Sequence, residues 1–401
     1  MFIYLHVQTQ GLMKTKLFIA CIILSVIFPG VTRAQETDEL NAIQYVVPFL
    51  LIAPDSRAGA MGDAGVATSP DIYSMHWNPA KYAFIDGEGG VGISYSPWLR
   101  TLVPDINIAY LAGYYRIDDK QVISSSLLYS SLGDIPFTDD WGNVERNFRP
   151  NEFSLDAAYS RKLTKNFSGS IAFRFIYSNL TGGFPAGGTE TKPGTSIASD
   201  ISFYYNKNIR LASKDASLSL GTNISNIGAK MSYTDDDTDP DFIPMNLRLG
   251  PSLNIEIDRY NDITFAVDFN KLLVPTPPKY DEISGEIIAG KDPNVSVPAA
   301  IFQSFADAPG GFREELNEIS YSFGAEYWYR KQFAIRGGYF HEHASKGNRK
   351  YFTAGAGFRM NVFSLDFSYL MPLVNNHPLA RTLRFSISFD FDAFRNIKPA
   401  D

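Results

Sequence analysis

The feature that most limits how this chain can fold is a regular alternation of apolar and polar residues over segments of about ten residues. The last segment would place Leu383, Phe385, Ile387, Phe389 and Phe391 on one face, and Arg384, Ser386, Ser388 and Asp390 on the other. One face suits lipid, and charges on the other face are tolerable only against a wet or protein-filled lumen. The alternation therefore predicts an all-β fold, a transmembrane antiparallel β-barrel.

The number of alternating segments sets the size of the expected barrel. They begin near Gly89, Asp105, Lys120, Asn151, Asn166, Ser196, Asp215, Pro244, Asn261, Glu318, Gln332, Lys350, Val362 and Ala380. We therefore expect about 14 strands, an even number as bacterial barrels require, over residues 89–394, followed by a tail, 395–401. A soluble two-sheet sandwich is the alternative, but it would not explain the export signal, the plug-like prefix and the alternating loop lengths together.

The links between these segments alternate in length. Tight turns are expected on the periplasmic side at Asp118 and Asp119, Leu163 and Thr164, Arg330 and Lys331, and Met360 and Asn361. Longer links, 132–150, 179–195, 228–243 and 273–317, are expected outside the cell. Two features depart from this pattern. The outer links near Ser345 and Asn375 are short, and Gly250 followed by Pro251 within a strand requires a bulge or a bend.

The N-terminus has the features of an export signal. Lys14 and Lys16 precede an apolar run, 17–28, and a small-residue cleavage site ends at Ala34, so residues 1–34 are predicted to be a signal peptide with an upstream extension. Its removal would take away the only cysteine, Cys21, and three basic residues, which changes the formal net charge from −7 to −10. The mature chain then has no thiol chemistry, and its acidity argues against nucleic acid as a partner.

Residues 35–88 precede the barrel and do not alternate in this way. The apolar run 45–52 could be an extra strand, or a tether in the barrel or at its periplasmic mouth. The stretch after it is rich in Gly and Ala and ends in the turn-forming sequence Trp77-Asn78-Pro79-Ala80. We expect this stretch to fold into the lumen as a plug, with its glycines allowing close packing against the wall. An ordinary surface loop is the alternative.

This stretch also carries a resemblance to a known family. The pattern Arg57-Ala58-Gly59-x-Met61-Gly62-x-Ala64-x-Val66-Ala67, followed by Asp71 and by Trp77 to Ala80, resembles the N-terminal signature of FadL-like outer-membrane barrels. The run from Asp63 to Asp71 and the run from His76 to Lys81 resemble, in detail, the barrel component of the type IX secretion system. The resemblance implies a plug motif made of Arg57, Gly59, Gly62, Asp63, Gly65, Trp77, Asn78 and Pro79.

The same resemblance implies a function, which is not enzymatic. It implies an outer-membrane component that binds the C-terminal signal domain of secreted cargo and engages the large translocon channel. Such a component would shuttle cargo to the surface sortase and attachment complex, where cargo is joined to lipopolysaccharide. A FadL-like channel for small hydrophobic molecules is the alternative, and a sister barrel of the same secretion system is a third possibility. No cofactor is implied.

The longer links supply candidates for partner contacts, because exposed aromatics on Gly- and Pro-shaped loops are typical protein anchors. The candidates are Phe137, Trp141, Phe184, Phe302, Phe305 and Phe312. The alternative is that they pack on one another over the barrel mouth or belong to an interfacial girdle. Residues 312–316 are expected to form a helical turn.

Other polar clusters do not predict a site. The acidic run 235–241 fails the EF-hand spacing, since Pro240 occupies the Gly position, and it is expected to be a solvated loop tip. His341 and His343 could share one face of a strand, but a transition-metal site needs at least a third ligand. No nucleophile-elbow motif accompanies the serines and histidines, so we expect no enzyme.

Overall fold

The structure, a computed structural model, describes residues 40–100, 103, 105–138, 141, 143–184, 189–234, 240–360, 362–374 and 378–391. The predicted signal peptide, the predicted tail and the acidic residues 235–239 lie outside the described residues.

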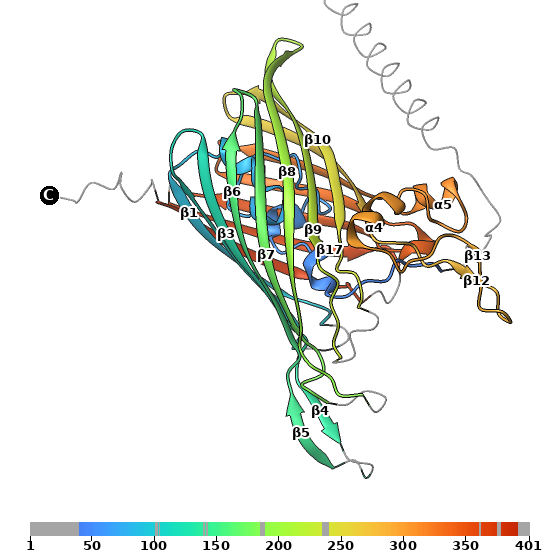
Figure 1. The fold of residues 1–401 in the computed structure, drawn as a ribbon. Coiled ribbons are helices and arrows are strands. Elements are labelled where there is room, and N and C mark those ends of the chain that lie inside the picture. Colours follow the sequence, from blue (N-terminus) through green and yellow to red (C-terminus); the bar gives the residue numbers. More distant parts are fainter. Residues whose placement is uncertain are drawn as a thin grey trace, which may run out of the picture. The chain divides into compact units, whose positions relative to one another are not determined.

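A closed antiparallel barrel is the main feature of the fold, and within the described residues it contains fourteen strands (Figure 1). Around the barrel these are β1 (Gly89–Pro97), β2 (Asn107–Arg116), β3 (Gln121–Ser131), β6 (Asn151–Lys162), β7 (Phe167–Asn179), β8 (Gly194–Leu211), β9 (Lys214–Gly228), β10 (Asn246–Asp258), β11 (Asn261–Leu272), β14 (Ser320–Tyr329), β15 (Phe333–His341), β16 (Lys350–Arg359), β17 (Phe363–Pro372) and β18 (Leu383–Asp390). The barrel closes where β18 pairs with β1, with Ile387 opposite Ile93. The predicted fold class and strand number are confirmed.

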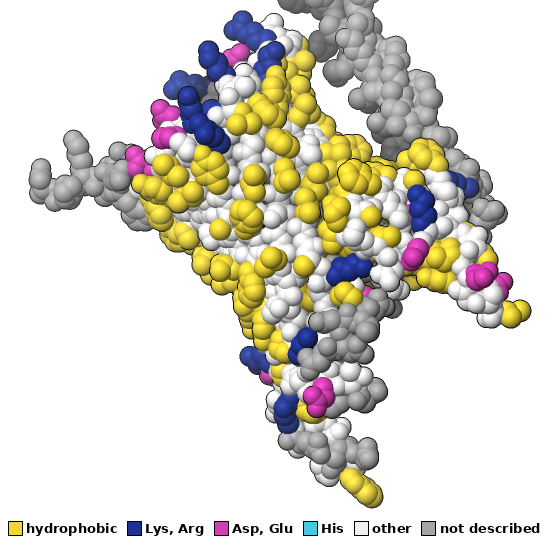
Figure 2. All heavy atoms as spheres, viewed as in Figure 1, with side chains coloured by type: hydrophobic (Ala, Val, Ile, Leu, Met, Phe, Trp, Pro, Cys, Tyr) yellow, Lys and Arg dark blue, Asp and Glu magenta, His cyan; other side chains and the backbone are white. Residues whose placement is uncertain are grey.

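The alternation seen in the sequence becomes an alternation between lumen and exterior. In β3, Ser124 and Ser126 are buried inside, whereas Ile123 and Leu127 are exposed outside. Figure 2 shows hydrophobic side chains spread over the outer wall, between charged residues at one end of the barrel and the outer links. Within the described residues, no helix is long and apolar enough to cross a membrane.

The links differ at the two ends of the barrel, as the sequence predicts. At one end, here called the short-turn end, strands are joined by tight turns such as the one between Tyr329 and Phe333. At the other end, the long-link mouth, the links carry elements of their own. These are the hairpin β4 (Ile135–Thr138) and β5 (Val144–Phe148), the pair β12 (Lys279–Tyr280) and β13 (Ile287–Ala289), α4 (Val297–Gln303), α5 (Phe312–Asn317) and η3 (Ala344–Lys346). The helical turn predicted at residues 312–316 lies within α5.

A bulge or a bend was expected at Gly250 and Pro251, and the structure shows no bulge there. Both residues pair with β9, and the register toward β11 is the same on either side of them, so that only two pairings with β11 are lost. Proline has no N–H to donate, and a missing bond is accommodated here without an extra residue. The register shift in β10 instead lies between Glu256 and Asp258.

The segment before β1 runs through the lumen and contains η1 (Pro48–Leu51), α2 (Ser56–Gly59), α3 (Ser74–Trp77) and η2 (Pro79–Phe84). It contains no strand between residues 40 and 88, all of which the structure describes. Its start lies among the long links, because Asn41 N donates to Ser345 O and Val46 N donates to Phe242 O. The apolar run therefore starts at the long-link mouth, and its residues Val47 and Phe49 are buried in one cluster with Ile108 of the inner wall. It is a tether in the barrel, and the expected alternative of an extra strand is wrong.

Candidate functional sites: the lumen plug and the outer links

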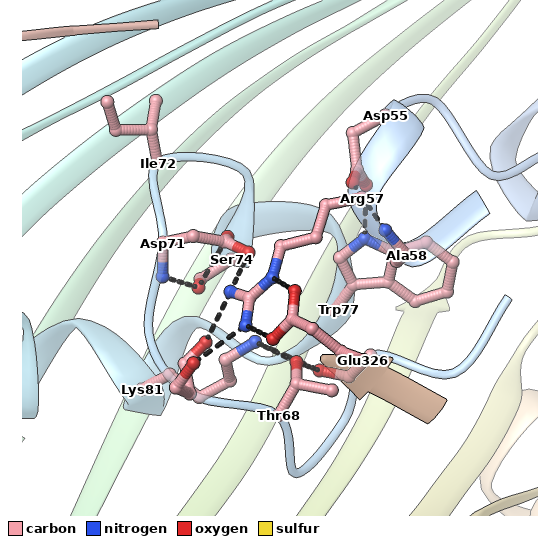
Figure 3. A network of polar contacts seen from close by, with 12 residues as sticks. Asp55, Arg57, Ala58, Thr68, Asp71, Ile72, Ser74, Trp77, Lys81 and Glu326 are labelled. Carbon is pink, nitrogen blue, oxygen red and sulfur yellow. Dashed lines mark hydrogen bonds and ion pairs between the residues drawn. The ribbon is translucent and has the colours of Figure 1, made fainter. Parts of the chain in front are cut away.

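Arg57 is the centre of the polar network that fixes the plug, here defined as residues 55–84, to the barrel wall (Figure 3). Its Nε and Nη2 donate to the two carboxylate oxygens of Glu326 in β14, at 3.0 and 2.8 Å. Its Nη1 donates to Asp71 at 2.8 Å. Glu326 also accepts from Arg336 Nε at 2.6 Å. Because these side chains are almost fully buried, each charge depends on its partners for the solvation that water no longer supplies.

Asp55 fixes the first turn of the plug to the helix α3. One of its carboxylate oxygens accepts from Ala58 N at 2.9 Å and caps α2, and the other accepts from the Trp77 indole N–H at 2.6 Å. Trp77 lies on α3, so this one carboxylate joins two parts of the plug that are 22 residues apart in sequence. The arrangement satisfies a helix N-terminus and a buried indole with the same group.

Lys81 and Asp268 hold the middle of the plug. Lys81 Nζ donates to Gly65 O at 3.0 Å and to Thr68 Oγ1 at 3.1 Å, and its side chain is fully buried. Asp268, on the inner face of β11, accepts from the backbone N–H groups of Gly65 and Val66 at 2.8 and 2.9 Å. The backbone N–H and C=O groups of Gly65 thus form hydrogen bonds with side chains rather than with a neighbouring strand.

The plug glycines allow a close approach that a larger residue would prevent. Gly62 has a φ of +69°, and a Cβ there would lie 2.6 Å from the backbone N and O of Tyr339 in β15. A Cβ on Gly65 would lie 2.4 Å from the Trp77 ring, and one on Gly59 would lie 2.8 Å from Arg384 Nη1. The small residues therefore allow the plug to lie directly on the wall and on itself.

The remaining motif residues complete the contacts with the wall. Asn78 Nδ2 donates to Val66 O at 2.9 Å and to Phe203 O of β8 at 3.0 Å. Pro79 begins η2, and its carbonyl accepts from Ser160 Oγ of β6 at 2.8 Å. Asp63 accepts from the Tyr351 hydroxyl of β16 at 2.6 Å.

The structure thus gives every residue of the predicted plug motif a contact within the plug or with the wall. Their partners on the wall, Glu326, Arg336 and Asp268, were not among the predicted site residues. Charged residues on the inward face of alternating strands were the available signal, but alternation does not show which plug residue meets which charge.

Two of the candidate partner-contact aromatics pack on each other. Phe137 of the β4–β5 hairpin stacks on Phe184 of the β7–β8 link, with ring centroids 3.9 Å apart. The Arg146 guanidinium lies 3.9 Å from the Phe184 centroid and donates to Gly182 O at 3.0 Å. These aromatics therefore join two outer links.

The other four candidates are more exposed. Trp141 lies at the tip of the β4–β5 hairpin with 88% of its surface exposed, and Phe312 of α5 is 77% exposed. Phe302 of α4 is 80% exposed, and Phe305, just after that helix, is 49% exposed. The six aromatics are spread over three links, the β3–β6, β7–β8 and β11–β14 links.

The β11–β14 link encloses a cluster of charged groups. Lys271 Nζ contacts Glu315 at 3.0 Å and Glu318 at 2.6 Å, and Lys346 Nζ contacts Glu318 at 3.0 Å. Asp307, also buried, accepts from Thr276 N at 3.2 Å. Burial, together with the nearby charges of Glu315 and Glu318, raises the pKa of Asp307 to about 6. These contacts tie the link to the barrel rim.

The two histidines do not share a strand. His341 ends β15 and its Nδ1 contacts the Tyr339 hydroxyl at 3.1 Å, whereas His343 lies beyond the strand and caps η3. The expectation that they lie on one strand is therefore wrong. In the described residues there is no group of three or more His, Cys, Asp or Glu side chains placed to hold a metal ion.

The chain matches the model of a known protein family. The model of the PorV family, described as "Type IX secretion system protein PorV", matches residues 34–279. No curated protein matches the chain.

Several solved structures are similar to this one. The Pseudomonas putida toluene transporter TodX is 11% identical, with a TM-score of 0.48, and the match covers 88% of this chain and 98% of TodX. The monoaromatic hydrocarbon channel CymD is 11% identical, with a TM-score of 0.49 and coverage of 85% and 98%. A Pseudomonas aeruginosa FadL homologue is 13% identical, with a TM-score of 0.40 and coverage of 85% and 99%.

Proposed function

Because the chain belongs to the PorV family of type IX secretion system proteins, we propose that this outer-membrane barrel binds the C-terminal signal domain of secreted proteins. It would engage the large translocon channel, receive cargo there and pass it to the surface sortase and attachment complex, where cargo is joined to lipopolysaccharide. Export of the barrel itself would use residues 1–34 as a cleaved signal peptide.

The filled lumen is the observation that carries this proposal beyond family membership. The plug crosses the lumen, and its charged residues are paired with charges on the inner wall, as Arg57 is with Glu326. Opening a path would break buried ion pairs, which costs about 3–5 kcal/mol for each pair that loses one partner. A protein that recognises cargo at its rim, and does not conduct it, needs no such opening.

The outer links then supply the recognition surface. Trp141 and Phe312 are large, exposed aromatics on two different links at the long-link mouth, which is the extracellular side in this proposal. Aromatic side chains of this kind dominate binding energy at many protein interfaces. Phe137 and Phe184 would support the hairpin that carries Trp141, since they stack on each other.

Photo-crosslinking in the native outer membrane tests the proposal. A photoreactive residue at Trp141 or Phe312 should capture secreted proteins that still carry their C-terminal domain, or the translocon. The same residue at Phe385, which is exposed on the outer wall of β18, is the matched control and should capture lipid. Capture of lipid alone from all three positions, with intact secretion after deletion of the gene, would instead favour a channel for small hydrophobic molecules.

A further inference from the structure

The link between β11 and β14 extends over the outside of the barrel wall. Lys271 of β11 is separated from Phe265 and Phe269 by even numbers of positions, so all three side chains lie on the outer face of the strand. Its ammonium group is nevertheless buried, because Glu315 and Glu318 of the link cover it. The ion pairs therefore attach this part of the link to the outside of the wall and shield a charge that would otherwise face the membrane boundary.

Apolar contacts attach α4 to the same outer face. Ala300 is fully buried there, and Ile301 packs in one cluster with Ile224 of β9 and Leu247 of β10. Ile224 and Leu247 are paired across the two strands and point outward, in phase with the exposed Leu220 and Leu249. The helix thus lies on the lipid-facing side of the barrel, near the long-link mouth.

The remaining face of α4 is apolar and uncovered. The helix reads Val-Pro-Ala-Ala-Ile-Phe-Gln and carries no charged residue. Phe302 is 80% exposed, and the ring of the half-exposed Phe305 lies 5.8 Å from Lys271 Nζ. In Figure 2, hydrophobic side chains on the outer wall continue onto the region where Figure 1 places α4. The exposed phenyl rings therefore extend the lipid-facing belt rather than form a separate patch.

We propose that α4 is a membrane-contacting shelf, and that Phe302 and Phe305 insert into the lipid at the boundary between headgroups and acyl chains on the long-link side. Aromatic side chains are favoured at that depth, where outer-membrane barrels carry their girdles. The shelf would widen the apolar belt beside β9, β10 and β11 and fix the height of this link above the membrane. It assigns Phe302 and Phe305 to lipid, and leaves Trp141 and Phe312 for protein partners.

Site-directed spin labelling tests this assignment. With Cys21→Ser, the full chain carries one introduced thiol per variant, at Phe302→Cys, at Phe305→Cys or, as the control, at Ile283→Cys. Ile283 is 98% exposed, in the turn between β12 and β13 of the same link. In vesicles of phosphatidylethanolamine and lipopolysaccharide, labels at 302 and 305 should collide more with oxygen than with a water-soluble nickel complex. The label at 283 should show the reverse ratio.

A water-like ratio at 302 and 305, equal to that at 283, would overturn the proposal and favour a protein partner for α4. Correct folding of each variant is checked by the slower gel mobility of the heat-denatured barrel, so that a misfolded variant is not scored.

Discussion

Arg57 of the plug and Glu326 of β14 form a bidentate ion pair inside the barrel, although they lie 269 positions apart in sequence. Arg57→Ala removes the plug side of this pair and also removes the Arg57–Asp71 ion pair. We expect a loss of about 3–5 kcal/mol in the free energy of unfolding, because breaking a buried pair leaves an uncompensated charge. The measurement is urea unfolding in vesicles, followed by tryptophan fluorescence.

Arg210→Ala is the matched control for this prediction. Arg210 also pairs with an aspartate, Asp215, but both side chains are largely exposed at the short-turn end. An exposed pair contributes about 0–1 kcal/mol, so this variant should unfold like the parent. Equal losses from the two arginines would show that the plug network adds no stability of its own.

Gly62→Ala tests whether the plug needs its close approach to the wall. Its added methyl group would meet the backbone of Tyr339, which cannot move aside as a side chain can. Gly285 has nearly the same φ, +70°, but open space around it. Both substitutions introduce the strain of a left-handed backbone, about 1 kcal/mol, and only Gly62→Ala adds a clash. We expect Gly62→Ala to raise ion conductance in planar bilayers and Gly285→Ala to leave it unchanged.

The wall of the barrel was predictable because its signal is local. Alternation within one strand determines which residues face lipid, as Ile387 and Phe385 do, without reference to any other strand. The lengths of links follow directly from the spacing of these segments. The expected fold class and strand number were therefore confirmed.

The contacts inside the lumen were not predictable in the same way. Asp268 accepts hydrogen bonds from the N–H groups of Gly65 and Val66, which lie about half the chain away in sequence. No periodic pattern relates these positions. The position of the tether depends on Ser345 and Phe242, which lie in two separate links. For the same reason, the sequence could not show that Phe137 and Phe184 would stack on each other.

Asp307 should make the β11–β14 link sensitive to pH. Burial raises the pKa of this carboxyl from 3.8 to about 6, so the folded link binds its proton more tightly than the unfolded chain does. The resulting stability is complete below pH about 4, falls as the pH rises to about 6, and stays lower above it. Protection of the Thr276 amide, which donates to Asp307, should fall over this window in hydrogen exchange corrected for intrinsic rates.

Asp307→Asn should remove this pH dependence, because an amide does not titrate. Glu282→Gln, at an exposed position of the same link, should retain the dependence of the parent. A parent protein whose Thr276 protection is constant between pH 4 and pH 7 would contradict the assignment to Asp307.

Arg146 should control how firmly the β4–β5 hairpin is joined to the β7–β8 link. Its guanidinium covers the Phe184 ring and bonds to Gly182 O, so Arg146→Ala removes both contacts at once. A cation–π contact at an exposed site contributes about 0.5–1 kcal/mol, and the Phe184 amide should exchange several-fold faster in the variant. Arg149→Ala should leave that amide unchanged, because Arg149 pairs with Asp134 within its own link. If Trp141 binds cargo from the tip of this hairpin, its photo-crosslinks should weaken in Arg146→Ala and persist in Arg149→Ala.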